Sequence, residues 1–114
     1  MKKRREIIIF KSYFFDFYNQ QPEYVKLKIE WTIQLIRELE RIPKRFFKHV
    51  ESTKGIYEIR VEAESNTFRI FCFFDVGNII VLGNAYQKKP NKLSKREIIR
   101  AIKIQEEYKY ERQS

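Results

Sequence analysis

The sequence predicts an α+β domain, in which a small and largely antiparallel sheet follows an N-terminal helical hairpin and precedes a C-terminal helix. Residues 54–89 have the pattern of three consecutive strands, and residues 22–39 and 94–112 carry apolar side chains at helical spacing. A chain of 114 residues, 43% of them hydrophobic, is long enough for one core of moderate size. A single domain over residues 1–114 is therefore expected.

The N-terminal part is predicted to form one strand and two helices. Residues 6–10 are β-branched and flanked by charge, which favours a strand, either at an edge of the sheet or at its centre. Ser12 could cap a short helix that ends before Pro22, although the five aromatic residues that follow Ser12 also suit a strand. Pro22 and Glu23 are typical of the start of a longer helix.

This longer helix has two apolar stripes. One contains Val25, Ile29, Ile33, Ile36 and Leu39, and the other contains Leu27, Trp31 and Leu35. Two stripes predict two packing partners, namely the sheet and the preceding aromatic helix, which together give a helical hairpin laid on the strands. Trp31 is accordingly expected in the core or the hairpin, and a protein-binding groove is the alternative.

Residues 54–89 are the central part of the chain, and the helices before and after them are expected to pack against it. Apolar and polar residues alternate over 55–63 and 67–75, and the nearly continuous apolar run over 78–89 contains Gly83, which indicates a bulge or a close backbone approach. Short turns between the strands predict an antiparallel meander. Its polar positions would form a cationic surface, made of Glu58, Arg60, Arg69, Tyr86, Lys88 and Lys89.

Arg69 stands alone among apolar residues in its strand. Burying an unpaired guanidinium costs several kcal/mol, so Arg69 needs a carboxylate partner such as Glu58 or access to an anion.

The net charge of +9 predicts attraction to a polyanion, which could be RNA, DNA, an acidic protein or an anionic membrane. Rings such as Tyr86 or Phe71 among these cations favour nucleic acid, because aromatic rings stack on unpaired bases. The apolar run over 7–10 is too short for a signal peptide or a membrane span. A soluble, cytoplasmic protein that does not bind membranes is expected.

Residues 44–53 are predicted to form a basic loop that contains the only histidine, His49. A general acid/base role for His49 is one reading, because its unperturbed pKa of about 6.5 lies near neutrality; an exposed or hydrogen-bonded loop histidine is the commoner case. Cys72 is expected to be a packed small hydrophobe, which suits a reducing compartment. One histidine and one distant cysteine do not suit zinc, so no metal site is predicted.

The C-terminal helix is predicted to begin at a capping box formed by Ser94 and Glu97. Ile98, Ala101 and Ile102 line its apolar face, and an ordinary solvated surface accounts for its many Lys and Arg residues.

Three runs in this order resemble the RelE/HigB-like toxins, and among them the phage-derived Gp49-like branch. They are KGIYEIR at residues 54–60, TFRIFCFF at 67–74 and AYQKK at 85–89 before a capped helix. The resemblance covers nearly the whole chain and implies the RelE/ParE-like fold. It also implies the toxin of a type II toxin-antitoxin pair, which cleaves mRNA in the ribosomal A site and inhibits translation.

The implied reaction is attack of a ribose 2'-OH on the adjacent phosphate, which leaves a 2',3'-cyclic phosphate and a free 5'-OH. The implied partners are the ribosome, mRNA and a helix-turn-helix antitoxin of HigA type, and no cofactor is implied. An endoribonuclease of this kind needs a base, a cationic phosphate site and an acid.

By position, the resemblance makes Glu58 the base and assigns the scissile phosphate to Arg69 with Arg60. Lys89 or Tyr86 would serve as the acid or as a charge stabiliser. Some relatives have a histidine near the end of the last strand; this chain has none there, and Tyr86 is the substitute. The lysines expected to contact RNA are Lys54, Lys88, Lys92 and Lys95.

Two alternatives remain open. The related ParE-like proteins share the fold, lack the nuclease residues and act on DNA gyrase. A non-catalytic module that binds RNA or the ribosome would need only the charge and the stacking rings.

Overall fold

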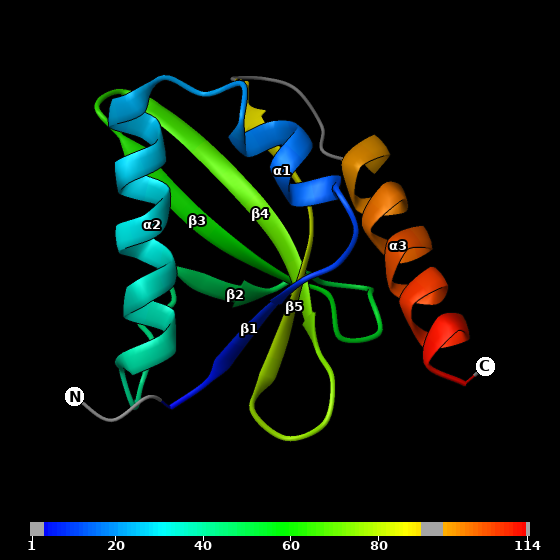
Figure 1. Ribbon diagram of the computed structural model, residues 1–114. Coiled ribbons are helices and arrows are strands. Elements are labelled where there is room, and N and C mark those ends of the chain that lie inside the picture. Colours follow the sequence, from blue (N-terminus) through cyan, green and yellow to red (C-terminus); the bar gives the residue numbers. More distant parts are fainter. Residues whose placement is uncertain (1–3, 90–94, 114) are drawn as a thin grey trace.

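A computed structural model describes residues 4–89 and 95–113, which form an α+β fold with five strands and three helices. The sheet has the order β1-β5-β4-β3-β2 (Figure 1), in which β1 pairs with β5 in parallel and the other pairs are antiparallel. The strands are β1 (Glu6–Ile9), β2 (Phe47–His49), β3 (Tyr57–Ala63), β4 (Asn66–Phe74) and β5 (Ile79–Lys88). The helices are α1 (Tyr13–Tyr18), α2 (Glu23–Glu38) and α3 (Lys95–Gln113). No helix within the described ranges is both long and apolar enough to cross a membrane.

The predicted meander is confirmed as β3-β4-β5, including an irregularity beside Gly83. Ile70 pairs with Ala85 but Cys72 pairs with Leu82, so β5 carries an extra residue there. A Cβ atom built on Gly83 would lie 3.4 Å from the carbonyl oxygen of Phe71 and 3.6 Å from the Ile104 side chain. Glycine therefore lets β5 pass close beneath α3.

The sheet is covered on both faces. The side that we call the α2 face buries Ile59, Ile70 and Leu82 against α1 and α2, and the side that we call the α3 face buries Phe71, Phe73 and Val81 against α3. Alternation of side chains along β4 separates the two cores, since Phe68, Ile70 and Cys72 belong to the first and Phe71 and Phe73 to the second. Cys72 is fully buried, and burial raises the pKa of its thiol.

β1 lies at an edge of the sheet, which is one of the two positions that the sequence left open. Three other N-terminal predictions need correction. The Ser12 side chain makes no capping bond to the backbone of α1; its hydroxyl lies 3.2 Å from a carboxylate oxygen of Asp16 instead. The helical hairpin is not confirmed, because α1 has only six residues and packs on β5, whereas α2 packs on β3. Trp31 was expected in the core or the hairpin, but 48% of its surface is exposed.

The predicted loop over residues 44–53 contains a strand. β2 pairs with β3 in antiparallel register, so that Lys48 lies opposite Glu58 and His49 opposite Tyr57. Three residues are too few for a strand pattern to stand out from the sequence.

Arg5 joins the N-terminal segment to the end of α2. Its Nη1 donates to the carbonyl oxygens of Ile36 at 2.9 Å and Leu39 at 2.6 Å, and its Nη2 donates to that of Glu40 at 3.0 Å. These carbonyls have no partner within the helix, and a cation also complements the negative end of the helix dipole. Arg5 therefore caps α2 from a distant part of the sequence.

We expect Arg5→Ala to lower the free energy of unfolding by about 2 kcal/mol, because charged hydrogen bonds to several carbonyls are lost at once. Urea denaturation followed by circular dichroism measures this. Arg4→Ala is the matched control: its side chain makes one surface ion pair, to Glu40 at 3.9 Å, which is worth at most about 0.5 kcal/mol. Equal losses in the two variants would contradict a capping role for Arg5.

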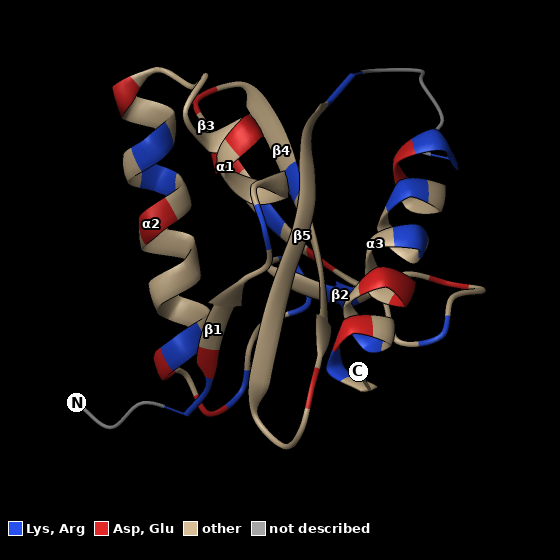
Figure 2. Ribbon diagram, turned by 45° about the vertical axis from the view of Figure 1, so that its right-hand side comes forward, with Lys and Arg blue, Asp and Glu red and all other residues tan. Residues whose placement is uncertain are grey.

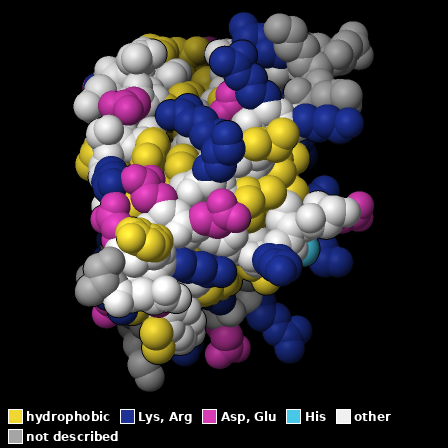
Figure 3. Space-filling view, turned by 90° about the vertical axis from the view of Figure 1, so that its right-hand side faces the viewer, with side chains coloured by type: hydrophobic (Ala, Val, Ile, Leu, Met, Phe, Trp, Pro, Cys, Tyr) yellow, Lys and Arg dark blue, Asp and Glu magenta, His cyan; other side chains and the backbone are white. Residues whose placement is uncertain are grey.

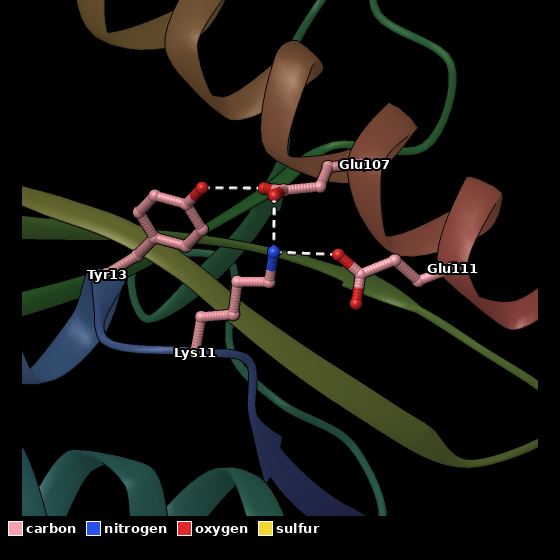
Figure 4. A network of polar contacts seen from close by, with 4 residues as sticks. All are labelled: Lys11, Tyr13, Glu107 and Glu111. Atoms are coloured by element: carbon pink, nitrogen blue, oxygen red, sulfur yellow. Dashed lines mark hydrogen bonds and ion pairs between the residues drawn. The ribbon is translucent and has the colours of Figure 1, made fainter.

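A polar network fastens α3 to the segment between β1 and α1 (Figure 4). Lys11 Nζ lies 2.6 Å from a carboxylate oxygen of Glu107 and 2.7 Å from one of Glu111, and the Tyr13 hydroxyl donates to the other oxygen of Glu107 at 2.6 Å. The hydrogen bonds from Lys11 and then Tyr13 hold the pKa of Glu107 below its usual value, and the same contacts raise the pKa of Lys11.

The network predicts a pH dependence of stability. The lowered pKa of Glu107 stabilises the fold above its unfolded pKa of about 4.5, and this contribution disappears as the pH falls through the folded pKa. The raised pKa of Lys11 acts in the opposite direction, so its contribution is complete below its unfolded pKa and disappears only in strong base. Glu107→Gln should therefore be less stable than the parent protein at pH 7, by a margin that shrinks below about pH 4.5.

Urea titrations at pH 7 and in steps down to pH 3 measure this margin. Glu106→Gln is the control, because Glu106 is exposed on the same helix and makes none of these contacts. A margin that does not depend on pH would contradict the assignment.

Candidate functional site

α3 covers only part of the α3 face, and polar side chains occupy the part that it does not contact. Residues paired across neighbouring strands point to the same side of a sheet, so the register assigns them to rows. Arg60, Arg69 and Tyr86 form one row across β3, β4 and β5, and Glu62, Thr67 and Lys88 form the next. A third row runs from Lys48 through Glu58 to Phe71. We call this region the polar sheet surface; it consists of Lys48, Glu58, Arg60, Glu62, Thr67, Arg69, Tyr86 and Lys88.

Two guanidinium groups are opposite each other at its centre. Arg60 and Arg69 are direct partners in the β3–β4 ladder, a position where like charges destabilise a sheet. A carboxylate of β3 balances the charge of each arginine. Arg69 Nε lies 3.2 Å from Glu58 Oε2, and Arg60 Nη2 lies 3.5 Å from Glu62 Oε2. The predicted pairing of Arg69 with Glu58 is confirmed.

The Arg69–Glu58 pair is the more buried of the two. The side chains of Arg69 and Glu58 are 22% and 12% exposed, whereas those of Arg60 and Glu62 are 42% and 55% exposed. Shielding from water strengthens the first pair and makes removal of either member costly. The second pair is weak, because solvent screens it.

These pairs do not satisfy every donor of the two arginines. Nε of Arg60 and Nε of Arg69 are both buried without an aligned hydrogen bond within the described part of the chain, and the 3.2 Å contact to Glu58 is an ion pair of poor hydrogen-bond geometry. Two opposed guanidinium groups favour an added anion, since an anion would relieve their mutual repulsion.

Tyr86 lies beside the two arginines, and its ring packs on a buried aromatic side chain. Its ring stacks on that of Phe71, with centroids 5.8 Å apart and planes inclined by 17°. Phe71 is only 1% exposed, so the expectation that Phe71 could stack on a base is wrong: α3 covers it. Tyr86 is half-buried and completes the central row.

The predicted lysines divide into three groups. Lys88 shares the polar sheet surface, whereas Lys89 is exposed just beyond the end of β5, and Lys95 is exposed on the first turn of α3. These three lie at one end of the molecule, where Lys and Arg mark both the end of β5 and the start of α3 (Figure 2). Lys54 lies in the loop before β3, where its carbonyl oxygen accepts from Gln105 at 2.9 Å. Lys92 lies outside the described residues.

The other sequence candidates are away from this surface or outside the described residues. His49 pairs with Tyr57, and the two rings are 5.2 Å apart. Since neighbours along a strand alternate, His49 points to the side opposite Lys48 and Glu58 and does not join the site. Ser94 lies outside the described residues, so the capping box stays a prediction; the Glu97 carboxylate accepts from Asn84 Nδ2 at 3.3 Å.

Lys48 is a member of the polar sheet surface that the sequence did not indicate. Its position opposite Glu58 follows from β2, and β2 was not predicted. The alternation of Lys48 between Phe47 and His49 was the only signal, and it covers too few residues to be read.

The outer surface of α3 extends the cationic region. Figure 3 views the molecule from the side of α3 and shows Lys and Arg side chains in both its upper and its lower half, with Asp and Glu side chains among them. The upper half is where α3 begins (Figure 1). Arg96, Arg100 and Lys103 line a groove of about 600 Å³ there, together with Glu97 and Ile99. The second half of α3 carries Glu106, Glu107 and Glu111, so the charge of this helix changes along its length.

Comparison with known proteins connects this arrangement to a family. A search of curated proteins finds no match. The sequence model of the family described as Phage derived protein Gp49-like (DUF891) matches residues 16–106, which include β2 to β5, α2 and most of α3. The polar sheet surface lies entirely within the matched range. The chain therefore belongs to the Gp49-like family of phage-derived proteins, a RelE/HigB-like toxin family.

Proposed function

We propose that this protein is the toxin of a type II toxin-antitoxin system and that it cleaves mRNA on the ribosome. The observation that carries the proposal is the row of Arg60, Arg69 and Tyr86 across three strands, with the Glu58 carboxylate 3.2 Å from Arg69. Family membership supports a toxin in general. The catalytic assignment rests on the chemistry of these side chains.

The proposed reaction begins when a scissile phosphate binds to the two guanidinium groups. A phosphate oxygen competes with Glu58 for Arg69, because an arginine fork binds phosphate and carboxylate in the same way. The Glu58 carboxylate is thereby released to accept the proton of the neighbouring ribose 2'-OH.

The 2' oxygen then forms a bond to phosphorus, and the bond from phosphorus to the 5' oxygen breaks. Arg69 and Arg60 stabilise the additional negative charge of the five-coordinate phosphorane. Tyr86 or Lys89 donates a proton to the departing 5' oxygen, and the products are a 2',3'-cyclic phosphate and a 5'-OH. Lys88, which shares the surface with Tyr86, adds positive charge beside the RNA backbone, and Lys54, Lys92 and Lys95 would hold more distant parts of it.

The ribosome would supply the alignment of RNA that the polar sheet surface does not supply by itself. The side chains of Arg60 and Glu62 are 42% and 55% exposed, so this part of the polar sheet surface is open to solvent and does not by itself align a flexible RNA strand. A message held in the A site would already be oriented, which supplies much of the rate enhancement expected from positioning. This proposed site of action is cytoplasmic.

Cell-free translation with mapping of mRNA ends tests the proposal. We expect cuts within the translated message that require ribosomes, with a 5'-OH on each downstream fragment, and no cuts in the same message without ribosomes. Inhibited translation without cuts would favour a non-catalytic ribosome-binding module. Unimpaired translation together with blocked supercoiling by DNA gyrase would favour a ParE-like toxin.

The proposed partner is a HigA-like antitoxin with a helix-turn-helix domain. It would neutralise the toxin by covering the polar sheet surface or by keeping the toxin off the ribosome. Co-expression of such a protein from a neighbouring gene should restore growth, and failure of every neighbouring gene to do so would count against a toxin-antitoxin pair.

A further inference from the structure

The outward side of α2 carries an apolar stripe that no described element covers. Tyr24, Leu27, Trp31 and Leu35 recur three and four residues apart, and we call these four residues the outer stripe. The first three are 45%, 57% and 48% exposed. The side of α2 that faces the sheet is formed by other residues, Val25, Ile29, Thr32 and Ile36. Figures 1 and 2 show no other helix or strand on the outward side of α2.

The outer stripe is larger than isolated exposed residues would be. It spans twelve positions, and the eleven steps between Tyr24 and Leu35, at about 1.5 Å each, give about 16 Å or three turns of helix. Phe46 enlarges it, since its ring packs against Trp31 edge to face with centroids 6.0 Å apart. Single exposed apolar residues are common on proteins, but a continuous patch marks an interaction surface.

Cations flank the centre of the outer stripe. Lys28 Nζ lies 4.2 Å from the centroid of the Trp31 ring, and Arg45 Cζ lies 4.6 Å from the centroid of the Phe46 ring. Arg45 is exposed and Lys28 is half-buried. Glu23 and Glu38 stand near the two ends of α2, so the charge beside the paired rings is positive.

We propose that the outer stripe binds an amphipathic helix of a partner protein, one whose apolar residues recur every three to four positions between Asp and Glu residues. The apolar side chains of such a helix would pack between those of α2, as in other helix pairs, with axes about 8–10 Å apart. Its carboxylates would lie beside Lys28 and Arg45. Trp31, at the middle of the stripe, is the residue type that most often dominates such interfaces.

Charge also argues against a second copy of this chain as the occupant. A symmetric pair of outer stripes would bring the Lys28 and Arg45 side chains of both copies into one interface, in a protein that already carries a net charge of +9. An acidic helix removes that repulsion and replaces it with attraction.

The inference is independent of the proposed nuclease activity. The helix that carries the outer stripe covers the α2 face of the sheet, whereas Arg60, Arg69 and Tyr86 lie on the opposite face, the α3 face. A helix on the outer stripe therefore would not touch the proposed phosphate site, and binding at the stripe can be measured whether or not the protein cuts RNA.

Trp31 provides a direct readout, because it is the only tryptophan of the chain. The probes are two synthetic helical peptides of about 16 residues without tryptophan, each long enough to cover three turns. Both carry leucines at helical spacing; one has glutamates on either side of the leucines, and the other has lysines. We expect the acidic peptide to shift Trp31 emission to shorter wavelength in a saturable manner, at least about tenfold more tightly than the basic peptide, with affinity falling as salt is raised.

Two variants localise the binding. Leu27→Glu should weaken binding of the acidic peptide about tenfold or more, because it places a carboxylate in the apolar stripe and opposite the peptide's own acids. Val76→Glu is the matched control, since Val76 is an apolar residue, 72% exposed, in the turn between β4 and β5, and it should bind like the parent protein. Circular dichroism checks that both variants are folded.

Any of four results would overturn the inference. These are no saturable shift with the acidic peptide, equal binding by Leu27→Glu, equal binding of the basic peptide, or a dimer whose dissociation on dilution alters Trp31 emission. The last result would assign the outer stripe to a second copy of this chain.

Discussion

Replacing Arg69 with alanine is expected to lower ribosome-dependent mRNA cleavage by about 10²–10³-fold, which is the usual loss when one group that stabilises transition-state charge is removed. Arg69 is the arginine of the polar sheet surface that is held in a water-poor position, at 22% exposure. A charge there acts more strongly on a developing phosphorane than one in open solvent. The end-mapping assay measures the rate, and growth inhibition on induction should disappear with it.

Loss of activity is informative only if the variant folds. Arg69→Ala leaves the Glu58 carboxylate, which is 12% exposed, without its cation, and this is expected to cost about 1–3 kcal/mol of stability. The double variant Glu58→Gln/Arg69→Ala removes the stranded charge and should regain part of that loss while staying inactive. Arg45→Ala, an arginine away from this surface, should stay active. Full toxicity of a folded Arg69→Ala protein would place the phosphate site elsewhere.

Phe71→Ala is expected to lower the free energy of unfolding by about 3–5 kcal/mol, because it empties a large, well-packed position. Phe71 is 1% exposed between β4 and α3, in contact with the core around Val81 and Ile104. A domain of this size has a total stability of about 5–15 kcal/mol, so the variant would be close to unfolding at 37 °C. Urea and thermal denaturation measure the loss.

The same substitution should disturb the candidate site, since the Tyr86 ring stacks on Phe71. Phe15→Ala is the control for the chemical change, because Phe15 is 41% exposed on α1 and should cost no more than about 1 kcal/mol. Phe71→Leu keeps most of the volume and separates the two effects, since it should recover stability but not the ring contact with Tyr86. Equal losses for Phe71→Ala and Phe15→Ala would contradict the role of Phe71 as a buried support.

The three-strand meander and the final helix could be predicted because local signals agree there. Alternation, short turns and a single glycine in β5 all indicate the same pairing, and the register places Arg60, Arg69 and Tyr86 in one row. The pairing of Arg69 with Glu58 could also be predicted, since a guanidinium among apolar residues needs a carboxylate. The burial of Phe71 could not, because periodicity shows which residues share a face but not how far a distant helix covers it.

The remaining differences between prediction and structure also arise because local patterns do not show how distant segments meet. The partner of β1 is β5, which comes much later in the sequence, since Glu6 pairs with Ile79. No local pattern therefore indicates a parallel edge strand. Periodicity correctly shows two apolar stripes on α2, yet it does not show that α1 is too short to reach the second. Lys48 was missed because its strand has only three residues.

The position of β5 in the sheet has a consequence for the order of folding. β5 is the last strand to be synthesised, yet it lies between β1 and β4 and pairs with both. The first strand thus has no neighbour in the sheet until β5 has been made, and β4 is paired only on the side of β3 during that interval. Closing such a distant pair is slow in comparison with local hairpins. Arg69 and Tyr86 also come together only when β5 docks, so a nascent chain has the complete row of Arg60, Arg69 and Tyr86 only after β5 has been made.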